Sequence, residues 1–113
     1  MYKFVFLINP ISGGGQGKVI HRYLPEIMAS LNYTDDQWKA EFTNIDGLEK
    51  QISDALAGTE KLVAVGGDGT VSSVLSVMVS SEYAKSVKIG LIPLGTGNDL
   101  ARVLNLYKPY VDK

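Results

Sequence analysis

The stretch Leu62-Val-Ala-Val-Gly-Gly-Asp-Gly-Thr70 decides the fold. Its apolar half, residues 62–65, runs directly into three glycines and a carboxylate, Asp68, and apolar residues at helical spacing begin at Val71. A short, continuous apolar run is typical of a strand that is buried on both faces, as in a parallel sheet. The stretch therefore predicts a buried strand, a tight loop and the start of a helix.

The same order of elements recurs on both sides of this stretch. Apolar runs at residues 3–9 and 87–92 are each followed by a glycine-containing loop, at 10–17 and 93–97. Residues 38–43 alternate between apolar and polar, which is typical of a half-exposed edge strand. Apolar residues at helical spacing predict helices over about 18–31 (kinked or split at Pro25), 45–56, 71–78 and from about Asn98.

Strands and helices therefore alternate as βαβαβαβα, which predicts an α/β fold. We expect a three-layer architecture, in which an open, mainly parallel sheet carries helices on both faces. The edge character of residues 38–43 favours the strand order 2-1-3-4. In that order the chain changes direction between the first and third strands, where open α/β sheets bind ligands at the carboxyl ends of their strands. All three glycine loops would lie at this edge.

Composition narrows the class of protein. The chain has 113 residues, 45% of them hydrophobic and 20% charged, as expected for one small globular domain. A net charge of −1 provides no basic field for nucleic acid, and the absence of cysteine excludes a disulfide scaffold and a thiolate site. No apolar run is long enough to span a bilayer, and no signal-peptide pattern is visible, so we expect a cytoplasmic protein.

Glycine is concentrated in the loops. Ten of the twelve glycines lie in the segments 13–17, 66–69 and 90–97. The first loop joins a strand to a helix N-terminus, where free amide groups and the helix dipole favour an anion, and it includes the polar side chains of Ser12 and Lys18. It does not match the Walker pattern, and the alternative is a flexible strand-to-helix turn.

The second loop, Gly66–Thr70, is the most specific of the three. Asp68 could simply cap the helix that follows, but a cap does not need three glycines around it. The alternative is that Asp68 organises a metal held by phosphates, while Thr70 and backbone amides bind the phosphate oxygens. In the third loop, Thr96 could present its hydroxyl to a ligand, or Asn98 or Asp99 could cap the next helix.

Taken together, the segments Asn9–Gly13, Gly66–Thr70 and Pro93–Asp99 resemble the diacylglycerol kinase catalytic domain family. This family includes bacterial lipid kinases and eukaryotic diacylglycerol, ceramide and sphingosine kinases. The resemblance covers about residues 3–105. NAD kinases and phosphofructokinases share the Gly-Gly-Asp-Gly segment, whereas Gly95-Thr-Gly-Asn-Asp-Leu-Ala-Arg102 is typical of the lipid kinase branch.

The resemblance implies a transferase that uses ATP and Mg²⁺ to phosphorylate a lipid hydroxyl, typically converting diacylglycerol to phosphatidic acid. Asp68 and Asp99 would be the carboxylates nearest the phosphates and Mg²⁺. Carried over by position, the nucleotide-contacting residues would be Asn9, Pro10, Ile11, Ser12, Gly13, Thr43, Gly66, Gly67, Asp68, Gly69, Thr70, Val71, Ser72, Thr96, Gly97 and Asn98.

The family fold has a second, mostly β domain that supplies the lipid-binding surface and the catalytic base. We therefore interpret residues 1–105 as an N-terminal ATP-binding domain and 106–113 as a tail that leads to that second domain. This chain would then contain no catalytic base and would not phosphorylate lipid alone. Tyr107 and Tyr110 would lie at an apolar seam that favours a homodimer of the isolated domain.

The short length is one departure from the family pattern, and a second one concerns the residues after the second loop. Ser72 and Ser73 stand where bacterial members often have Asn-Glu, which leaves the lipid class undecided. The alternatives to a lipid kinase domain are a nucleotide kinase of the NAD kinase type and a nucleotide-binding module without catalysis. For the lipid kinase, the partners would be ATP, a lipid bound through the second domain and the membrane surface on which that lipid lies, without nucleic acid.

Overall fold

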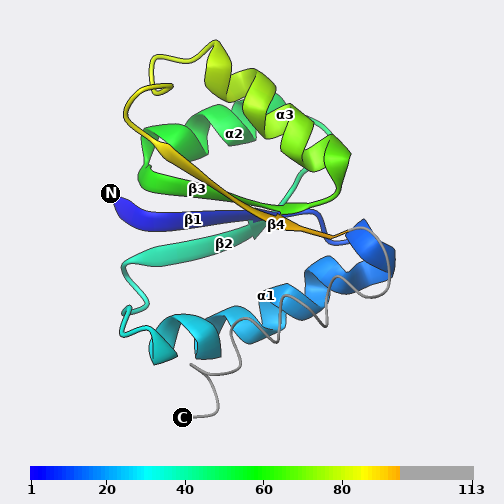
Figure 1. Ribbon diagram of the computed structural model, residues 1–113, viewed down its shortest axis with the longest axis vertical. Coiled ribbons are helices and arrows are strands. Elements are labelled where there is room, and N and C mark those ends of the chain that lie inside the picture. The colour runs from blue at the N-terminus through cyan, green and yellow to red at the C-terminus, as the bar shows by residue number, and fades with distance from the viewer. Residues whose placement is uncertain (95–113) are drawn as a thin grey trace.

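We describe residues 1–94 in a computed structural model of the protein (Figure 1). Four parallel strands form one sheet in the order β2-β1-β3-β4, which confirms the predicted α/β fold and strand order. The strands are β1 (Tyr2–Ile8), β2 (Trp38–Phe42), β3 (Thr59–Gly66) and β4 (Lys88–Pro93), and the helices are α1 (Ser12–Ser30), α2 (Leu48–Ala57) and α3 (Asp68–Val79).

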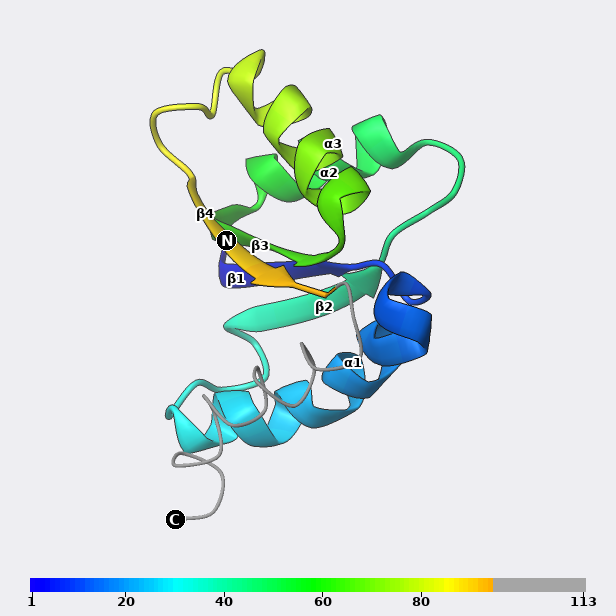
Figure 2. The same cartoon turned by 45° about the vertical axis from the view of Figure 1, so that its right-hand side comes forward.

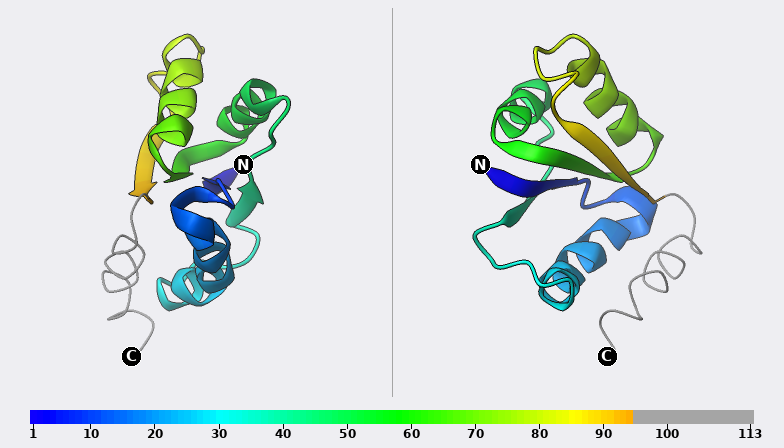
Figure 3. Two further views of the ribbon diagram at one scale, coloured as in Figure 1. Left: turned by 90° about the vertical axis from the view of Figure 1, so that its right-hand side faces the viewer. Right: turned by 60° about the vertical axis from the view of Figure 1, so that its left-hand side comes forward.

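Helices cover both faces of the sheet. Helix α1 lies on one face, and α2 and α3 lie side by side on the other (Figures 2 and 3). The central strands have apolar residues on both faces because both faces are covered. The core under α2 and α3 contains Val5, Leu7, Ile52, Leu56, Leu62, Ala64, Val74 and Met78, and the core under α1 contains Phe6, Ile8, Ile20, Leu24, Met28, Val63 and Val65.

The strand register brings the carboxyl ends of the strands to one edge of the sheet. Ile8, the last residue of β1, pairs with Phe42 of β2 and with Val65 of β3. Gly66, the last residue of β3, pairs with Pro93 of β4. The chain leaves β1 and β3 to opposite faces, into α1 and α3 respectively (Figure 1). This is the switch point at which the sequence predicts a ligand.

The first helix differs from the prediction. Its range includes a left-handed turn formed by Gly13, Gly14 and Gly15, and helical angles continue from Gln16, slightly before the expected start. A split of the helix at Pro25 is therefore wrong, because helical angles continue through that residue, whereas a kink there stays a prediction. Pro25 is exposed, so solvent can bond the carbonyl group that loses its helical N–H partner.

Three apolar residues that we expected to be buried in helix faces are exposed: Tyr23 (39%), Ile45 and Leu75. Ile45 lies outside α2 and is 100% exposed, because Gly47 has a left-handed backbone (φ 76°) and starts the helix two residues later. Leu75 is 42% exposed on α3. The helix expected from Asn98 lies outside the described residues. Among the helices within residues 1–94, none is long and apolar enough to cross a membrane.

Candidate functional site

A cleft opens at the carboxyl edge of the sheet, where the chain leaves β1, β2 and β3. It has a volume of about 410 Å³. It brings together five of the predicted contact residues from segments that are far apart in the sequence: Asn9, Pro10 and Ile11 after β1, Thr43 after β2, and Thr70 in α3. Gly69, a sixth, also lines it, together with Asn44, Ile45, Leu48 and Ser73.

The N-terminus of α3 borders this cleft and carries unpaired amide groups. Gly67 is the N-cap residue, and no side chain caps the helix. The first amide that bonds back along the helix is that of Val71, which donates to the Gly67 carbonyl. The amides of residues 68–70 therefore have no acceptor within the helix, and together with the helix dipole they form a site for an anion.

Side chains of the first loop hold the second loop in place. The Gly67 N–H donates to the Ser12 hydroxyl over 3.2 Å, and the Asn9 amide donates to the Thr70 hydroxyl over 3.4 Å. The Asn9 side-chain oxygen accepts the Ile11 N–H at 3.1 Å, so both ends of this carboxamide are used. Ser12 acts as the acceptor for Gly67, so its own hydroxyl proton remains available to a ligand.

The chain that follows β4 starts against the same loop. The Leu94 N–H donates to the Gly66 carbonyl at 2.8 Å, and Leu94 is buried. This contact brings the start of the third glycine segment to the second loop. Four predicted site residues of that segment, Thr96, Gly97, Asn98 and Asp99, lie outside the described residues.

Asp68 is the first residue of α3 and is exposed. The alternative in which its carboxylate caps the helix is wrong, because Gly67 occupies the N-cap position and no side-chain cap bond is formed. Within residues 1–94, no group of three or more His, Asp or Glu side chains is placed to hold a metal ion. Within these residues, Asp68 would therefore be a single carboxylate ligand for a divalent ion.

Four of the cleft residues were missed by sequence reasoning: Asn44, Ile45, Leu48 and Ser73. Three of them, Asn44, Ile45 and Leu48, could have been found from their position in the sequence. They follow the strand 38–43 and therefore lie at the same sheet edge as the glycine loops. Conversely, seven predicted contact residues among residues 1–94 do not line this cleft: Ser12, Gly13, Gly66, Gly67, Asp68, Val71 and Ser72. Ser72 borders the neighbouring groove between α2 and α3. A larger hollow of about 520 Å³ beside β2 and α2 contains none of the predicted site residues.

Comparison with known proteins agrees with this geometry. The chain is 33% identical over 120 residues to mouse diacylglycerol kinase iota, of which it covers 10%, and 34% identical over 103 residues to a diacylglycerol kinase of Staphylococcus carnosus, of which it covers 32%. It shares the fold of a diacylglycerol kinase from Bacillus anthracis, with a TM-score of 0.63, 24% identity and coverage of 97% of this chain and 39% of that one.

The chain thus spans only a small part of the curated relatives that it matches. The model of the diacylglycerol kinase catalytic domain matches residues 3–113, which include all three glycine-rich segments. Because this match extends over almost the whole sequence, the chain belongs to the diacylglycerol kinase catalytic domain family.

Proposed function

We propose that this chain is the ATP-binding part of a lipid kinase that transfers the γ-phosphate of ATP to the hydroxyl of diacylglycerol, giving phosphatidic acid. Family membership supports the kinase class, and the relatives named above are diacylglycerol kinases. The observation that carries the nucleotide site is the uncapped N-terminus of α3, which borders a cleft lined by three loops.

In this proposal the phosphates lie at the start of α3. The amides of residues 68–70 would donate to phosphate oxygens, and the Ser12 hydroxyl can add a further donor because its oxygen already accepts from Gly67. Gly69 has open space where a side chain would begin, so a phosphate can approach the backbone closely. These donors are held in place before any ligand arrives, which reduces the cost of ordering them.

The base and ribose would occupy the cleft. Its volume of about 410 Å³ lies within the usual range for small-molecule sites. Ile11 and Ile45 line the cleft from two different loops and are 76% and 100% exposed. A flat base that packs against these side chains would remove apolar surface from water, which favours binding. Thr43 and Asn44 supply polar groups in the same wall.

Mg²⁺ fits this arrangement through the phosphates. It is usually bound by one or two carboxylates together with substrate phosphates and water, and Asp68 supplies one exposed carboxylate beside the α3 amides. When bound, the ion would neutralise charge that develops on the phosphate oxygens. Asp99 is the second carboxylate that we assign to this role.

Phosphoryl transfer also needs a positioned acceptor and a proton acceptor. We assign the lipid-binding surface, the catalytic base and the contact with the membrane surface to parts of a longer protein, since this chain covers 32% of its Staphylococcus carnosus relative. The homodimer of the isolated domain is part of the same proposal. Among the described contacts and clefts, none specifically favours a nucleotide kinase of the NAD kinase type.

The full-length protein, incubated with γ-labelled ATP and Mg²⁺, tests the proposed reaction. The acceptors are vesicles that contain diacylglycerol, sphingosine or phosphatidylglycerol, and NAD in solution. We expect labelled phosphatidic acid from the full-length protein and none from residues 1–113 alone. Label in NAD only would replace the proposal with an NAD kinase, and ATP binding without transfer to any acceptor would replace it with a binding module.

A further inference from the structure

One side chain outside every glycine segment makes three hydrogen bonds next to the cleft. Gln51, in α2, accepts the Asn44 N–H at 2.8 Å through Oε1. Its Nε2 donates to the Phe42 carbonyl at 2.9 Å and to the Glu41 carboxylate at 3.4 Å. The first two bonds are made to the backbone groups on either side of Thr43.

These bonds replace a missing strand. β2 is at the edge of the sheet, so the backbone groups on its outer side have no strand to pair with. A residue of a neighbouring parallel strand would bond the carbonyl before Thr43 and the amide after it, and the Gln51 carboxamide bonds the same two groups. On the inner side, the Thr43 N–H donates to the Ile8 carbonyl at 2.8 Å. Thr43 is therefore held from both sides.

The groups around Gln51 are themselves held. Its own N–H donates to the Gly47 carbonyl at 3.0 Å, and the next residue, Ile52, is fully buried in the core. The Glu41 carboxylate that it reaches is paired with Lys39 at 2.7 Å, and this hydrogen bond raises the pKa of Lys39. Gln51 thus connects a fixed helix to the wall of the cleft.

We propose that Gln51 is a positioning residue for nucleotide binding, which acts by orienting Thr43. This inference rests on the proposed function, because it assumes that the nucleotide occupies the cleft lined by Thr43. Gln51 does not itself line that cleft and is not expected to touch the nucleotide.

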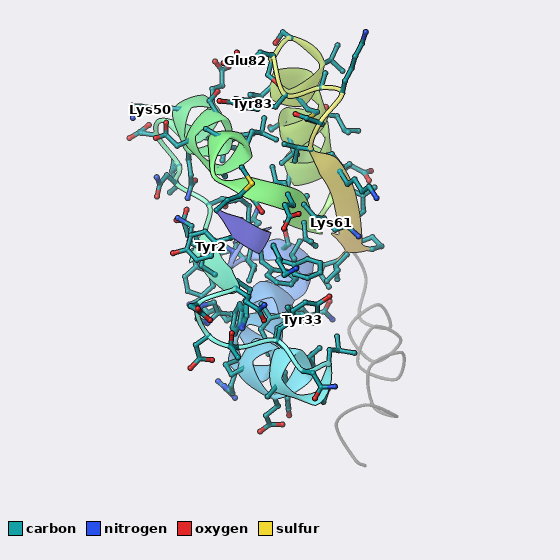
Figure 4. All side chains as sticks on the ribbon, turned by 90° about the vertical axis from the view of Figure 1, so that its left-hand side faces the viewer. Tyr2, Tyr33, Lys50, Lys61, Glu82 and Tyr83 are labelled. Atoms are coloured by element: carbon teal, nitrogen blue, oxygen red, sulfur yellow. The ribbon has the colours of Figure 1, made fainter. Side chains whose placement is uncertain are left out.

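The test uses Gln51→Met in the full-length protein, which keeps the length of the side chain and removes all three hydrogen bonds. The matched control is Lys50→Met, because Lys50 is the adjacent residue, is 82% exposed and extends from α2 away from the sheet (Figure 4). For Gln51→Met we expect the Kd of a non-hydrolysable ATP analogue and the KM for ATP to rise about fivefold, with kcat unchanged. The control should change neither.

A double-mutant cycle with Thr43→Val separates positioning from a general loss of structure. If Gln51 acts through Thr43, Gln51→Met should weaken nucleotide binding by less than about twofold in the Thr43→Val background. If Gln51→Met raised the Kd about fivefold in the Thr43→Val background as well, the proposal would be overturned. Wild-type affinity in Gln51→Met alone would also overturn it. Unchanged affinity in Thr43→Val alone would instead contradict the proposed nucleotide site.

Gln51→Glu is the second variant if Gln51→Met fails to fold. It keeps the acceptor for the Asn44 N–H and places a carboxylate against the Phe42 carbonyl and Glu41. We expect weaker nucleotide binding together with a shifted NMR signal of the Thr43 amide. A folded Gln51→Glu protein with unchanged affinity would overturn the proposal.

Discussion

Two groups of glycines at the carboxyl edge of the sheet, Gly13–Gly15 and Gly66, meet different structural requirements. In the left-handed turn, Gly13, Gly14 and Gly15 have φ values of 61°, 69° and 98°, a conformation that L side chains rarely adopt. In the loop at 66–69, no glycine has a positive φ. There the constraint is space, since a Cβ on Gly66 would lie 2.6 Å from the Thr70 hydroxyl oxygen and 3.2 Å from that of Ser12.

Positive φ at Gly13–Gly15 and close packing at Gly66 have different consequences for the candidate site. The left-handed turn directs the chain from Ser12 into the regular part of α1 that begins at Gln16, while Ser12 stays within hydrogen-bond distance of Gly67. The loop at 66–69 brings the backbone close to Thr70 and leaves the first amides of α3 without side-chain caps. Similar composition therefore predicts different responses to substitution in the two segments.

The largest effect is expected for Gly66→Ala. The added methyl group would displace Thr70 and Ser12, and crowding of this kind costs about 3 kcal/mol in the free energy of unfolding, measurable in urea. Gly67→Ala is the control. Its Cβ would lie 3.3 Å from the Leu94 carbonyl and its backbone is already extended, so we expect a loss below about 1 kcal/mol but clearly weaker ATP use. Equal losses of stability would contradict the role of space at Gly66.

Gly14 tests conformation without crowding, because a Cβ there would meet nothing within 4 Å. Gly14→Val should cost about 2 kcal/mol, since a β-branched side chain is strained at positive φ. Gly14→Asn should cost about half as much, because asparagine tolerates the left-handed region. Both are measured by urea unfolding, and equal losses in the two variants would show that the φ value does not set the requirement.

Gly69→Ala is expected to have the smallest effect on stability and the opposite sign. A Cβ at this position in the first turn of α3 meets nothing within 4 Å, and alanine favours the helix, so the free energy of unfolding should rise by about 0.5 kcal/mol. Because Gly69 lines the cleft, the same methyl group should weaken nucleotide binding several-fold in a titration with an ATP analogue. A more stable protein with unchanged affinity would place the phosphates elsewhere.

Much of the fold could be predicted from short segments. The continuous apolar runs at β1 and β3 predict buried parallel strands, and the alternation at β2 predicts an edge strand, which together imply the observed order. The predictions were wrong where they relied on the general behaviour of one type of residue, such as proline in a helix or an apolar residue at helical spacing. Pro25 does not split α1, since the backbone keeps helical angles through it, and Ile45 is excluded from α2 because Gly47 starts the helix later.

The candidate site could be predicted only in part. Asn9, Thr43 and Thr70 meet at one cleft, as expected from strands that end at a common edge. The hydrogen bonds of Ser12 to Gly67 and of Asn9 to Thr70 join residues 55 and 61 positions apart. No spacing pattern identifies such pairs, so sequence reasoning treated these side chains only as ligand contacts.

By itself, the sequence determined the alternation of strands and helices, the edge at which the glycine segments meet, and the resemblance to a family of kinases. These properties follow from local periodicity and from the chemistry of short motifs. Only the tertiary structure decided that Gln51 completes the edge of β2, and that Gly13, Gly14 and Gly15 have positive φ while Gly66 lacks space for a side chain. Both depend on which atoms lie next to a residue once the chain has folded, and neighbours from distant segments leave no local pattern.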